Sequence, residues 1–250
     1  MSGVGTPPRS LLNASDGARM SSTRPWILFD IDATLVDHEE AFRAGTAALH
    51  GESGGGQAAL ADFASRWSAA HRRNFDRFLA GEITHEEQRR ARVRETFGET
   101  LTDTEAERLF GVYIDAYEKA WVLFSDALHC LDALAGYRLG VISNGQSAQQ
   151  RAKLARLGIA DRFAHVTISQ DCGAAKPDPS IFRHACERCG VEPAAAVYVG
   201  DRYDLDAEGA RRAGLTGIWL DRERSASLRH VGPMIHSLAE LPALLEKLSR

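Results

Sequence analysis

Two aspartates separated by a single residue, Asp30 and Asp32, directly follow the short apolar run 26–29. If the backbone stays extended there, side chains two apart point the same way, and both carboxylates lie on one side. Two unit charges about 4 Å apart repel by about 4 kcal/mol at an effective dielectric constant of about 20. Such a pair needs a bound cation, a shared proton or separation by solvent. A solvated Asp-rich turn is the ordinary alternative, and the buried strand expected before it disfavours that alternative.

Three more groups of polar residues follow later in the chain. They are Ser143 with Asn144, Lys176 at the start of a Lys-Pro-Asp-Pro segment, and Asp201 followed by Asp206. Taken singly, Ser143 could be a helix cap, Lys176 a surface charge and Asp206 an acid in the first turn of a helix. Together they supply carboxylates, a hydroxyl and one ammonium group. This combination predicts a site for a divalent metal ion and a phosphate group.

The elements that must position these groups alternate between short apolar runs and helical patterns. The runs expected to form buried strands are 26–29, 139–142, 165–168, 196–199 and 217–220. The stretches expected to be helices are 126–134, 148–157, 180–189, 204–213 and 238–248. Such alternation is typical of an α/β protein with a parallel sheet and helices on both faces. In these sheets ligands bind beyond the carboxyl ends of the strands, where the polar groups above are expected.

The segment 38–122 differs from the rest because it contains no convincing strand. We expect helices over 41–50, 58–80, 84–97 and 103–121, with the loop 51–57 between the first two. That loop is rich in glycine but lacks the lysine and the following serine or threonine of a phosphate-binding loop, so we interpret it as a flexible turn. An all-helical block between the first and second strands indicates a second domain inserted into the first. The core domain is then 25–37 together with 123–250.

The composition is that of an ordinary globular protein. The 250 residues include 44% hydrophobic and 26% charged residues, and the formal net charge is −4. No apolar run approaches the roughly 18 residues of a membrane span, and the slight acidity excludes a globally basic protein, so neither a membrane nor a nucleic acid polymer is expected as a partner. The four cysteines are too few for a disulfide-built domain and are interpreted as thiols in a reducing cytoplasm. Residues 1–24 are expected to be a disordered tail rather than a secretory signal.

The polar motifs also identify a family by likeness. The chain resembles the haloacid dehalogenase superfamily, whose four motifs match residues 30–34, Ser143, Lys176, and Asp201 with Asp206. The resemblance covers residues 26–248, and the order, spacing and strand context of the motifs all agree. It implies a Rossmann-like parallel sheet that carries an inserted helical-bundle cap of the C1 type.

The resemblance implies a role for each carboxylate. Asp30 would be the nucleophile that forms an aspartyl-phosphate, and Asp32 would be first the general acid and then the general base. Mg²⁺ would be held by the carboxylates of Asp30 and Asp201 and by the backbone carbonyl oxygen of Asp32. Asp206 would complete the metal site by orienting the ligands around the ion.

Other motif residues would hold the phosphate. Ser143 and Lys176 would bind its non-bridging oxygens, Asn144 would position it through its backbone, and Thr34 is also expected to contact the substrate. Ala33 stands where glycine or asparagine is usual in the superfamily, so a positive φ at this residue would strain the loop slightly. No side chain that catalysis requires is lost through this difference.

The carboxyl group of Asp32 decides which reaction the resemblance implies. True dehalogenases of the superfamily displace halide from carbon and typically lack an acid at this position, because they have no alkoxide to protonate. Hydrolysis of a small phosphorylated metabolite is therefore expected, for example a nucleotide, a sugar phosphate or flavin mononucleotide. The alternatives are a 2-haloacid dehalogenase, a phosphomutase, or a binding protein without turnover on the same fold. A monomer or a homodimer is expected.

Substrate selection is expected to lie in the inserted cap. Its stretch 72–94 carries seven arginines, which are Arg72, Arg73, Arg77, Arg89, Arg90, Arg92 and Arg94. Most of them are interpreted as a solvated face paired with nearby glutamates, and one or two as facing an anionic substrate. The run 81–84 before the Arg-rich helix resembles the caps of nucleoside monophosphate and related small-phosphate phosphatases. Trp67, Phe75 and Phe78 have the helical spacing of a cap core rather than of a surface for base stacking.

Overall fold

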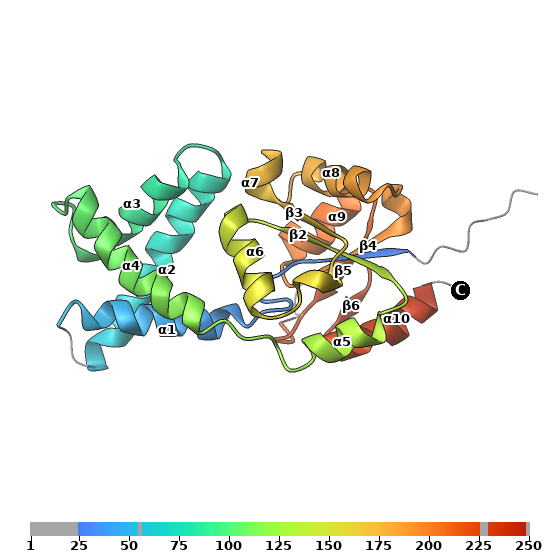
Figure 1. Cartoon of the computed structure of the whole chain (residues 1–250), viewed down its shortest axis with the longest axis horizontal. Helices are drawn as coiled ribbons and strands as arrows, with labels where there is room; N and C mark the ends of the chain where they lie inside the picture. Colours follow the sequence, from blue (N-terminus) through green and yellow to red (C-terminus); the bar gives the residue numbers. More distant parts are fainter. Residues whose placement is uncertain (1–24, 55–56, 226–229, 249–250) are drawn as a thin grey trace, which may run out of the picture.

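The computed structural model describes residues 25–54, 57–225 and 230–248, and the expected disordered tail 1–24 lies outside them (Figure 1). In the described part of the chain, six strands form one parallel sheet in the order β3-β2-β1-β4-β5-β6. They are β1 (Trp26–Phe29), β2 (Arg138–Ser143), β3 (His165–Ile168), β4 (Ala196–Gly200), β5 (Thr216–Leu220) and β6 (Met234–Ile235). The predicted α/β fold with a parallel sheet is confirmed. The prediction lacks β6 because two residues are too few to show a pattern.

Both faces of the sheet are apolar. Successive side chains of a strand point to opposite faces, and all four residues of β1 are apolar. Ile27 and Phe29 of β1 belong to one buried cluster, and Trp26 and Leu28 belong to another. The helices around the sheet are α5 (Ala127–Ala133), α6 (Ser147–Arg156), α8 (Pro179–Cys189), α9 (Glu208–Arg212) and α10 (Leu241–Leu248). Helices α5, α6 and α10 contribute to the first cluster, and α8 and α9 to the second. The sheet is therefore covered on both faces, as expected.

The strand order creates a crevice at one edge of the sheet. Strand β1 pairs with β2 on one side and with β4 on the other. Loops that follow such a central strand and its neighbours diverge, which leaves a crevice at the carboxyl ends. Asp30 follows β1 directly, Ser143 ends β2, and Asp201 follows β4. The topology thus brings three of the predicted site residues to one edge.

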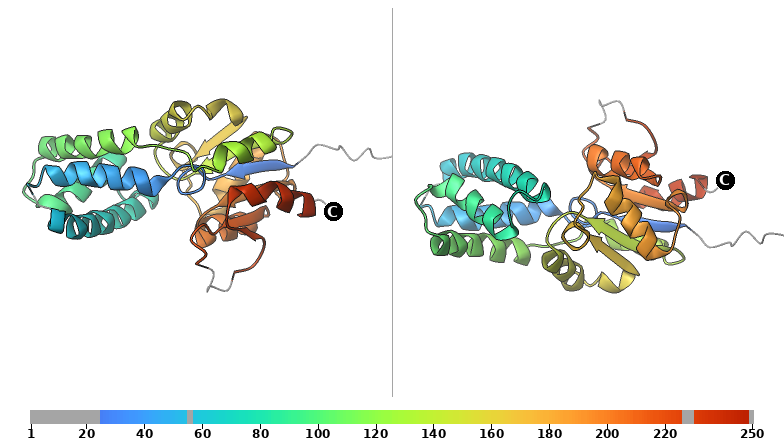
Figure 2. Two further views of the ribbon diagram at one scale, coloured as in Figure 1. Left: turned by 90° about the horizontal axis from the view of Figure 1, so that it is seen from below. Right: turned by 90° about the horizontal axis from the view of Figure 1, so that it is seen from above.

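Four helices between β1 and β2 form a bundle set beside the sheet (Figures 1 and 2). They are α1 (His38–Gly51), α2 (Gln57–Leu79), α3 (His85–Phe97) and α4 (Asp103–Lys119). The bundle has its own buried apolar cluster, which includes Trp67, Phe110 and Tyr113. Capping boxes at Thr84 and Thr102 fix the first residues of α3 and α4. The helices predicted from the sequence match these four to within a few residues at each end.

Two short linkers join the bundle to the sheet and run side by side. The backbone N–H of Asp37 donates to the carbonyl oxygen of Val122 at 2.9 Å, and Val36 pairs antiparallel with Leu123. Val36 also pairs with Asp32, on the loop that follows β1. The bundle is therefore tied directly to the loop that carries the two aspartates.

Local departures from the sequence prediction are small. Ala33 has a φ of 59°, so the strain expected of an L-residue at this position is present. The stretch 204–213, expected to be one helix, begins instead as a wide π-helical turn, Tyr203–Ala207, followed by α9. The prediction also lacks a short helix, α7 (Ser169–Cys172).

A search of the helices in the described ranges finds none with the length and apolar character needed to cross a membrane.

Candidate active site

A cavity of about 470 Å³ has walls from both the carboxyl edge of the sheet and the helical bundle. The predicted site residues in its wall are Asp30, Asp32, Ser143, Asn144, Lys176, Asp201 and Asp206. Thr34 is not among the lining residues: its side chain is fully buried, and its hydroxyl has no hydrogen-bond partner among the described residues. The expected contact between Thr34 and substrate therefore stays a prediction, whereas the other seven residues share one cavity.

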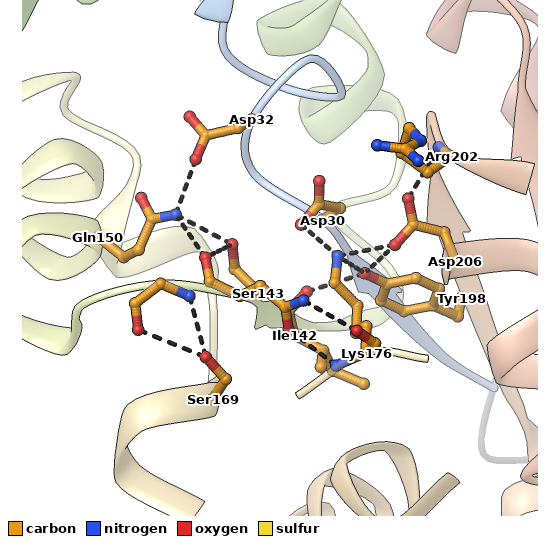
Figure 3. Close-up of polar contacts among 12 residues, drawn as sticks. Asp30, Asp32, Ile142, Ser143, Gln150, Ser169, Lys176, Tyr198, Arg202 and Asp206 are labelled. Atoms are coloured by element: carbon orange, nitrogen blue, oxygen red, sulfur yellow. Dashed lines mark hydrogen bonds and ion pairs between the residues drawn. The ribbon is translucent and has the colours of Figure 1, made fainter. Parts of the chain in front are cut away.

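Lys176 stands at the centre of the polar network (Figure 3). Its Nζ donates to Oδ1 of Asp30 at 2.6 Å, to Oδ1 of Asp206 at 2.7 Å and to the hydroxyl of Tyr198 at 2.9 Å. Burial acts to lower the pKa of Lys176, but the charges of Asp206 and Asp30 outweigh it and hold that pKa above its ordinary value. Lys176 is therefore a permanent cation beside the expected nucleophile.

Asp206 is fully occupied by the protein's own donors. Besides Lys176, the Tyr198 hydroxyl lies 3.2 Å from its Oδ1, and the backbone N–H of Arg202 donates to its Oδ2 at 2.9 Å. Its carboxylate packs so closely on Gly200 that a side chain at residue 200 would collide with it. These contacts fit the predicted role of Asp206 in orienting the ligands around the ion, which stays a prediction.

Asp30 and Asp201 both resist ionisation in the protein without a bound cation. Burial raises the pKa of Asp30 to about 6, with Lys176 opposing the rise and Asp206 adding to it. Burial, together with the charges of Asp206 and Asp30, raises the pKa of Asp201 to about 8. Carboxylate oxygens of Asp30, Asp201 and Asp206 all lie within 4.8 Å of one another. One lysine does not neutralise three carboxylates, so the site favours an additional cation.

The residues present fit a hard divalent cation. Mg²⁺ prefers oxygen ligands and is commonly held by one or two carboxylates together with water and phosphate oxygens. Asp30 and Asp201 both line the cavity, and Asp206 holds Lys176 and the backbone of Arg202 in place beside them. The donor set is therefore of the kind that magnesium requires.

Asp32 has a different set of partners, on the bundle side of the cavity. Its Oδ1 accepts a hydrogen bond from Lys153 Nζ at 2.5 Å and lies 3.7 Å from His38 Nδ1, and its Oδ2 accepts one from Gln150 Nε2 at 2.8 Å. Burial acts to raise the pKa of Asp32, but Lys153 and His38 together hold it well below its ordinary value. Two aspartates two residues apart thus receive opposite pKa shifts.

Two amides brace the loops around the expected phosphate position. The side chain of Gln150 also donates to Ser143 Oγ at 3.1 Å and to the carbonyl oxygen of Asn144 at 3.2 Å (Figure 3). The side chain of Asn144 accepts a hydrogen bond from the backbone N–H of Lys176 at 2.8 Å and donates one to the backbone carbonyl oxygen of Lys176 at 3.0 Å. The Asn144 side chain therefore fixes the Lys176 loop, and the predicted phosphate contact of the Asn144 backbone falls to its N–H group, since its carbonyl oxygen accepts from Gln150.

The sequence analysis missed Gln150, Lys153, His38 and Tyr198. Gln150 and Lys153 are three apart and therefore share a face of α6, next to the buried Leu154. A lysine beside the apolar stripe of a helix is the signal that could have found it, because burying an ammonium group is costly without a partner. Tyr198 lies inside an apolar run and carries no comparable signal.

The fold and the site together define a class of protein. Carboxylates and a lysine lie at the carboxyl edge of a parallel α/β sheet, and this is the arrangement of the hydrolases that the sequence resembles. A family model described as haloacid dehalogenase-like hydrolase matches residues 25–214. The chain belongs to this family of hydrolases.

Curated relatives carry phosphatase names. The pyrimidine 5′-nucleotidase YjjG of Escherichia coli K12 is 30% identical over 234 residues, which are 89% of this chain and 98% of that protein. The glyceraldehyde 3-phosphate phosphatase of Methanopyrus kandleri is 47% identical over 87 residues, only 35% of this chain and 37% of that protein. The predicted enzyme class, phosphoric monoester hydrolase, agrees with both names.

Solved structures of the same fold cover nearly the whole chain. The hydrolase YfnB of Bacillus subtilis, bound to magnesium, gives a TM-score of 0.74 at 22% identity and covers 89% of this chain and 99% of that one. A 2-haloacid dehalogenase of Pseudomonas syringae gives 0.67 at 28% identity and covers 90% of this chain and 100% of that one. These likenesses confirm the predicted Rossmann-like fold.

Proposed function

We propose that this protein is a Mg²⁺-dependent phosphatase that hydrolyses a small-molecule phosphomonoester through an aspartyl-phosphate at Asp30. The observation that carries the proposal is the contrast between Asp30 and Asp32. Asp30 is buried beside Lys176 and the acidic pair, whereas Asp32 is held by Lys153, Gln150 and His38. The positions and partners support two separate tasks: Asp30 lies beside Lys176 at the metal and phosphate site, and Asp32, which Lys153 and His38 hold in its ionised form, can accept a proton and pass it on.

The reaction follows from these positions in two halves. An oxygen of Asp30 attacks phosphorus, the bond to the ester oxygen breaks, and that oxygen takes a proton from Asp32, which receives this proton from the phosphate monoanion as the substrate binds. Water then attacks the phosphorus of the aspartyl-phosphate and gives its proton to Asp32, which releases inorganic phosphate and restores Asp30. Lys176 and Ser143 hold the phosphate oxygens during both halves.

The metal would be held by the carboxylates of Asp30 and Asp201 and by the backbone carbonyl oxygen of Asp32. When bound, it would offset the negative charge of the phosphate and of the attacking carboxylate. Asp206 positions Lys176 and the loop at Arg202 next to these ligands. We assign it no direct contact with the ion.

The helical bundle is proposed to be a cap, 38–122, on a core of 25–37 and 123–250. Its side chains form part of the wall of the cavity that contains Asp30 and Asp32. A cap over this cavity excludes water during the attack by Asp30 and contacts the leaving group. Monomer or homodimer, and a cytoplasmic location in keeping with four free cysteines, belong to the same proposal.

The direct test is phosphate release from p-nitrophenyl phosphate and a panel of phosphorylated metabolites, with Mg²⁺ and with EDTA. We expect activity that requires the metal. A protein that releases no phosphate from any of them with Mg²⁺ contradicts the proposal and favours a binding protein without turnover. Interconversion of isomers without phosphate release identifies a phosphomutase instead.

A second candidate is a 2-haloacid dehalogenase, favoured by the likeness to the Pseudomonas syringae enzyme. The acid at Asp32 weighs against it, because displacement of halide leaves no alkoxide to protonate. Halide release from 2-haloacids, measured beside phosphate release, separates the two candidates.

Mg²⁺ is expected to raise the melting temperature more at pH 8 than at pH 6. The pKa values of Asp30, about 6, and Asp201, about 8, lie above the ordinary 3.8. The folded protein therefore keeps protons that the unfolded chain has already released, so in the absence of metal these groups lower stability as pH rises from about 4 to about 8. Metal binding replaces the protons and reverses that loss.

Thermal unfolding with Mg²⁺ or EDTA at the two pH values measures this difference. Asp201→Asn is the matched control. It removes one proposed metal ligand, which is also the carboxyl group with the higher of the two raised pKa values. Equal metal-induced shifts at pH 6 and pH 8 in the unsubstituted protein would contradict the assignment of these carboxylates.

A further inference from the structure

Seven arginines lie between residues 72 and 94, and the structure divides them into two groups. Five form ion pairs with carboxylates within or between the bundle helices: Arg73 with Glu95, Arg77 with Glu82, Arg89 with Glu107, Arg90 with Asp103, and Arg94 with Asp103. The other two, Arg72 and Arg92, line the cavity. Neither has a carboxylate partner among the described residues, and Arg72 is exposed, with a hydrogen bond to Ser68 Oγ at 3.0 Å.

Arg92 is buried without a counter-ion. It is 4% exposed, and its guanidinium carbon lies 4.2 Å from the ring centroid of Trp67 and 5.1 Å from that of Tyr113. Its Nε and Nη2 atoms have no hydrogen-bond partner in the described structure. A guanidinium group stays charged in proteins, and a buried charge without a partner is strongly unfavourable. The aromatic faces and a side-chain hydrogen bond to Tyr113 stabilise part of this charge, and the Nε and Nη2 donors stay unused.

The neighbours of Arg92 leave polar atoms unused in the same way. Among the described residues, His71 Nδ1, His85 Nδ1 and Gln88 Oε1 are buried atoms without hydrogen-bond partners, and all three residues line the same cavity. Burial lowers the pKa of both histidines, and the charge of Arg92 adds to this effect, so both rings are neutral at pH 7. Arg92 is then the buried positive charge at this end of the cavity, surrounded by groups that can form hydrogen bonds.

This end of the cavity is connected to the acid–base residue through packed side chains. Tyr113, against which Arg92 lies, stacks on Tyr117 with ring centroids 5.7 Å apart. The hydroxyl of Tyr117 lies 3.4 Å from Lys153 Nζ and 3.2 Å from His38 Nδ1, the two groups that hold Asp32. Since Asp32 serves the leaving oxygen, the Arg92 end of the cavity faces the leaving group rather than the transferred phosphate.

We propose that Arg92, with His71 and His85, forms a subsite for a carboxylate on the leaving group of the phosphomonoester substrate. The proposal rests on the proposed phosphatase function. The two unused donors, Nε and Nη2, lie on one edge of the guanidinium plane and match the two oxygens of a carboxylate. An uncharged base or sugar would leave the buried charge unbalanced, whereas a carboxylate balances it. Asp30 and Arg92 line the same cavity, whose volume of about 470 Å³ suits a small metabolite.

Pairs of substrates that differ in one carboxylate test the subsite. Phosphoserine is compared with phosphoethanolamine, and 2-phosphoglycolate with 2-hydroxyethyl phosphate, by kcat/KM for phosphate release. We expect the unsubstituted protein to prefer the carboxylate member of each pair by at least about 10-fold. Arg92→Met, which keeps the length of an apolar side chain, is expected to lower kcat/KM for that member by about 10- to 100-fold and to change the other member and p-nitrophenyl phosphate little.

Arg73→Met is the matched control, because Arg73 is paired with Glu95 and does not line the cavity. It should leave both ratios unchanged. The melting temperature of Arg92→Met should not fall, because the substitution removes an unpaired buried charge. No preference for the carboxylate member in the unsubstituted protein, or equal losses on all substrates in folded Arg92→Met, overturns the subsite. A preference for nucleoside monophosphates that Arg92→Met abolishes overturns it as well.

Failure of the phosphatase proposal is recognised separately, by absence of phosphate release from p-nitrophenyl phosphate with Mg²⁺. The subsite then remains testable by binding. In the Asp30→Asn background, 2-phosphoglycolate should raise the melting temperature more than 2-hydroxyethyl phosphate does. Adding Arg92→Met should remove that difference, and a difference that persists contradicts the subsite.

Discussion

Asp30→Asn is expected to lower phosphate release at least about 10³-fold, because an amide oxygen is a poor nucleophile and the substituted side chain cannot form the aspartyl-phosphate. The loss should appear in kcat with every substrate, including p-nitrophenyl phosphate, since all of them pass through the same intermediate. Initial rates of phosphate release with saturating Mg²⁺ measure the effect. A residual activity above a tenth of that of the unsubstituted protein contradicts the role of Asp30 as nucleophile.

The stability of this variant separates loss of chemistry from loss of fold. Burial disfavours the ionised form of Asp30, whose pKa is raised to about 6, so a neutral amide should be tolerated at this position. Lys176 keeps Asp206 as a partner in the variant. We therefore expect a melting temperature no lower than that of the unsubstituted protein. Asp204→Asn is the matched control, because its side chain is 66% exposed and it should leave the activity unchanged.

Asp32→Asn is expected to have an effect that depends on the leaving group. An alkoxide needs a proton as it leaves, so kcat/KM for an alkyl phosphate should fall by about 10²- to 10⁴-fold. The p-nitrophenolate ion is stable without a proton, so kcat/KM for p-nitrophenyl phosphate should fall far less. Because kcat/KM reports the first half of the reaction, the comparison isolates the general-acid step from the later activation of water.

The comparison needs a control for the loss of the Asp32 charge. Lys153 loses its partner in the Asp32→Asn variant, and this buried cation is expected to lower the melting temperature. The double variant Asp32→Asn with Lys153→Met removes both charges and should regain stability without regaining activity on alkyl phosphates. Equal losses on alkyl and aryl substrates would argue that Asp32 acts only in positioning.

Much of the fold could be predicted because its signals are local. The strands of the sheet are continuous apolar runs, since both faces are covered by helices, and the polar residues directly after β1 and β4 stand out against them. Parallel strands place their carboxyl ends at the same edge, so Asp30, Ser143 and Asp201 could be brought together without coordinates. The division into cap and core and the individual roles of the site residues stay proposals.

The remainder depends on how helices turn and meet, which a single sequence does not show. Lys153 reaches Asp32 only because one face of α6 is directed at the loop after β1. Which arginines are paired with carboxylates depends on α4. Its Glu107 pairs with Arg89 and its Asp103 with Arg90, whereas neither forms an ion pair with Arg92. Phe75, expected in the cap core, is half-buried and lines the cavity, whereas Trp67 is fully buried, as expected.

The paired linkers between the bundle and the sheet have a mechanical consequence. Two linkers joined by the Asp37–Val122 hydrogen bond would act as one hinge if the bundle moves relative to the sheet, as the proposed cap requires. Val36 in these linkers is paired with Asp32, so a swing of the bundle would be transmitted to the residue proposed as the acid–base catalyst. In the proposed phosphatase, opening to admit substrate and aligning the proton donor would then be a single motion, whereas a chain with a longer, unpaired linker would have to coordinate the two separately.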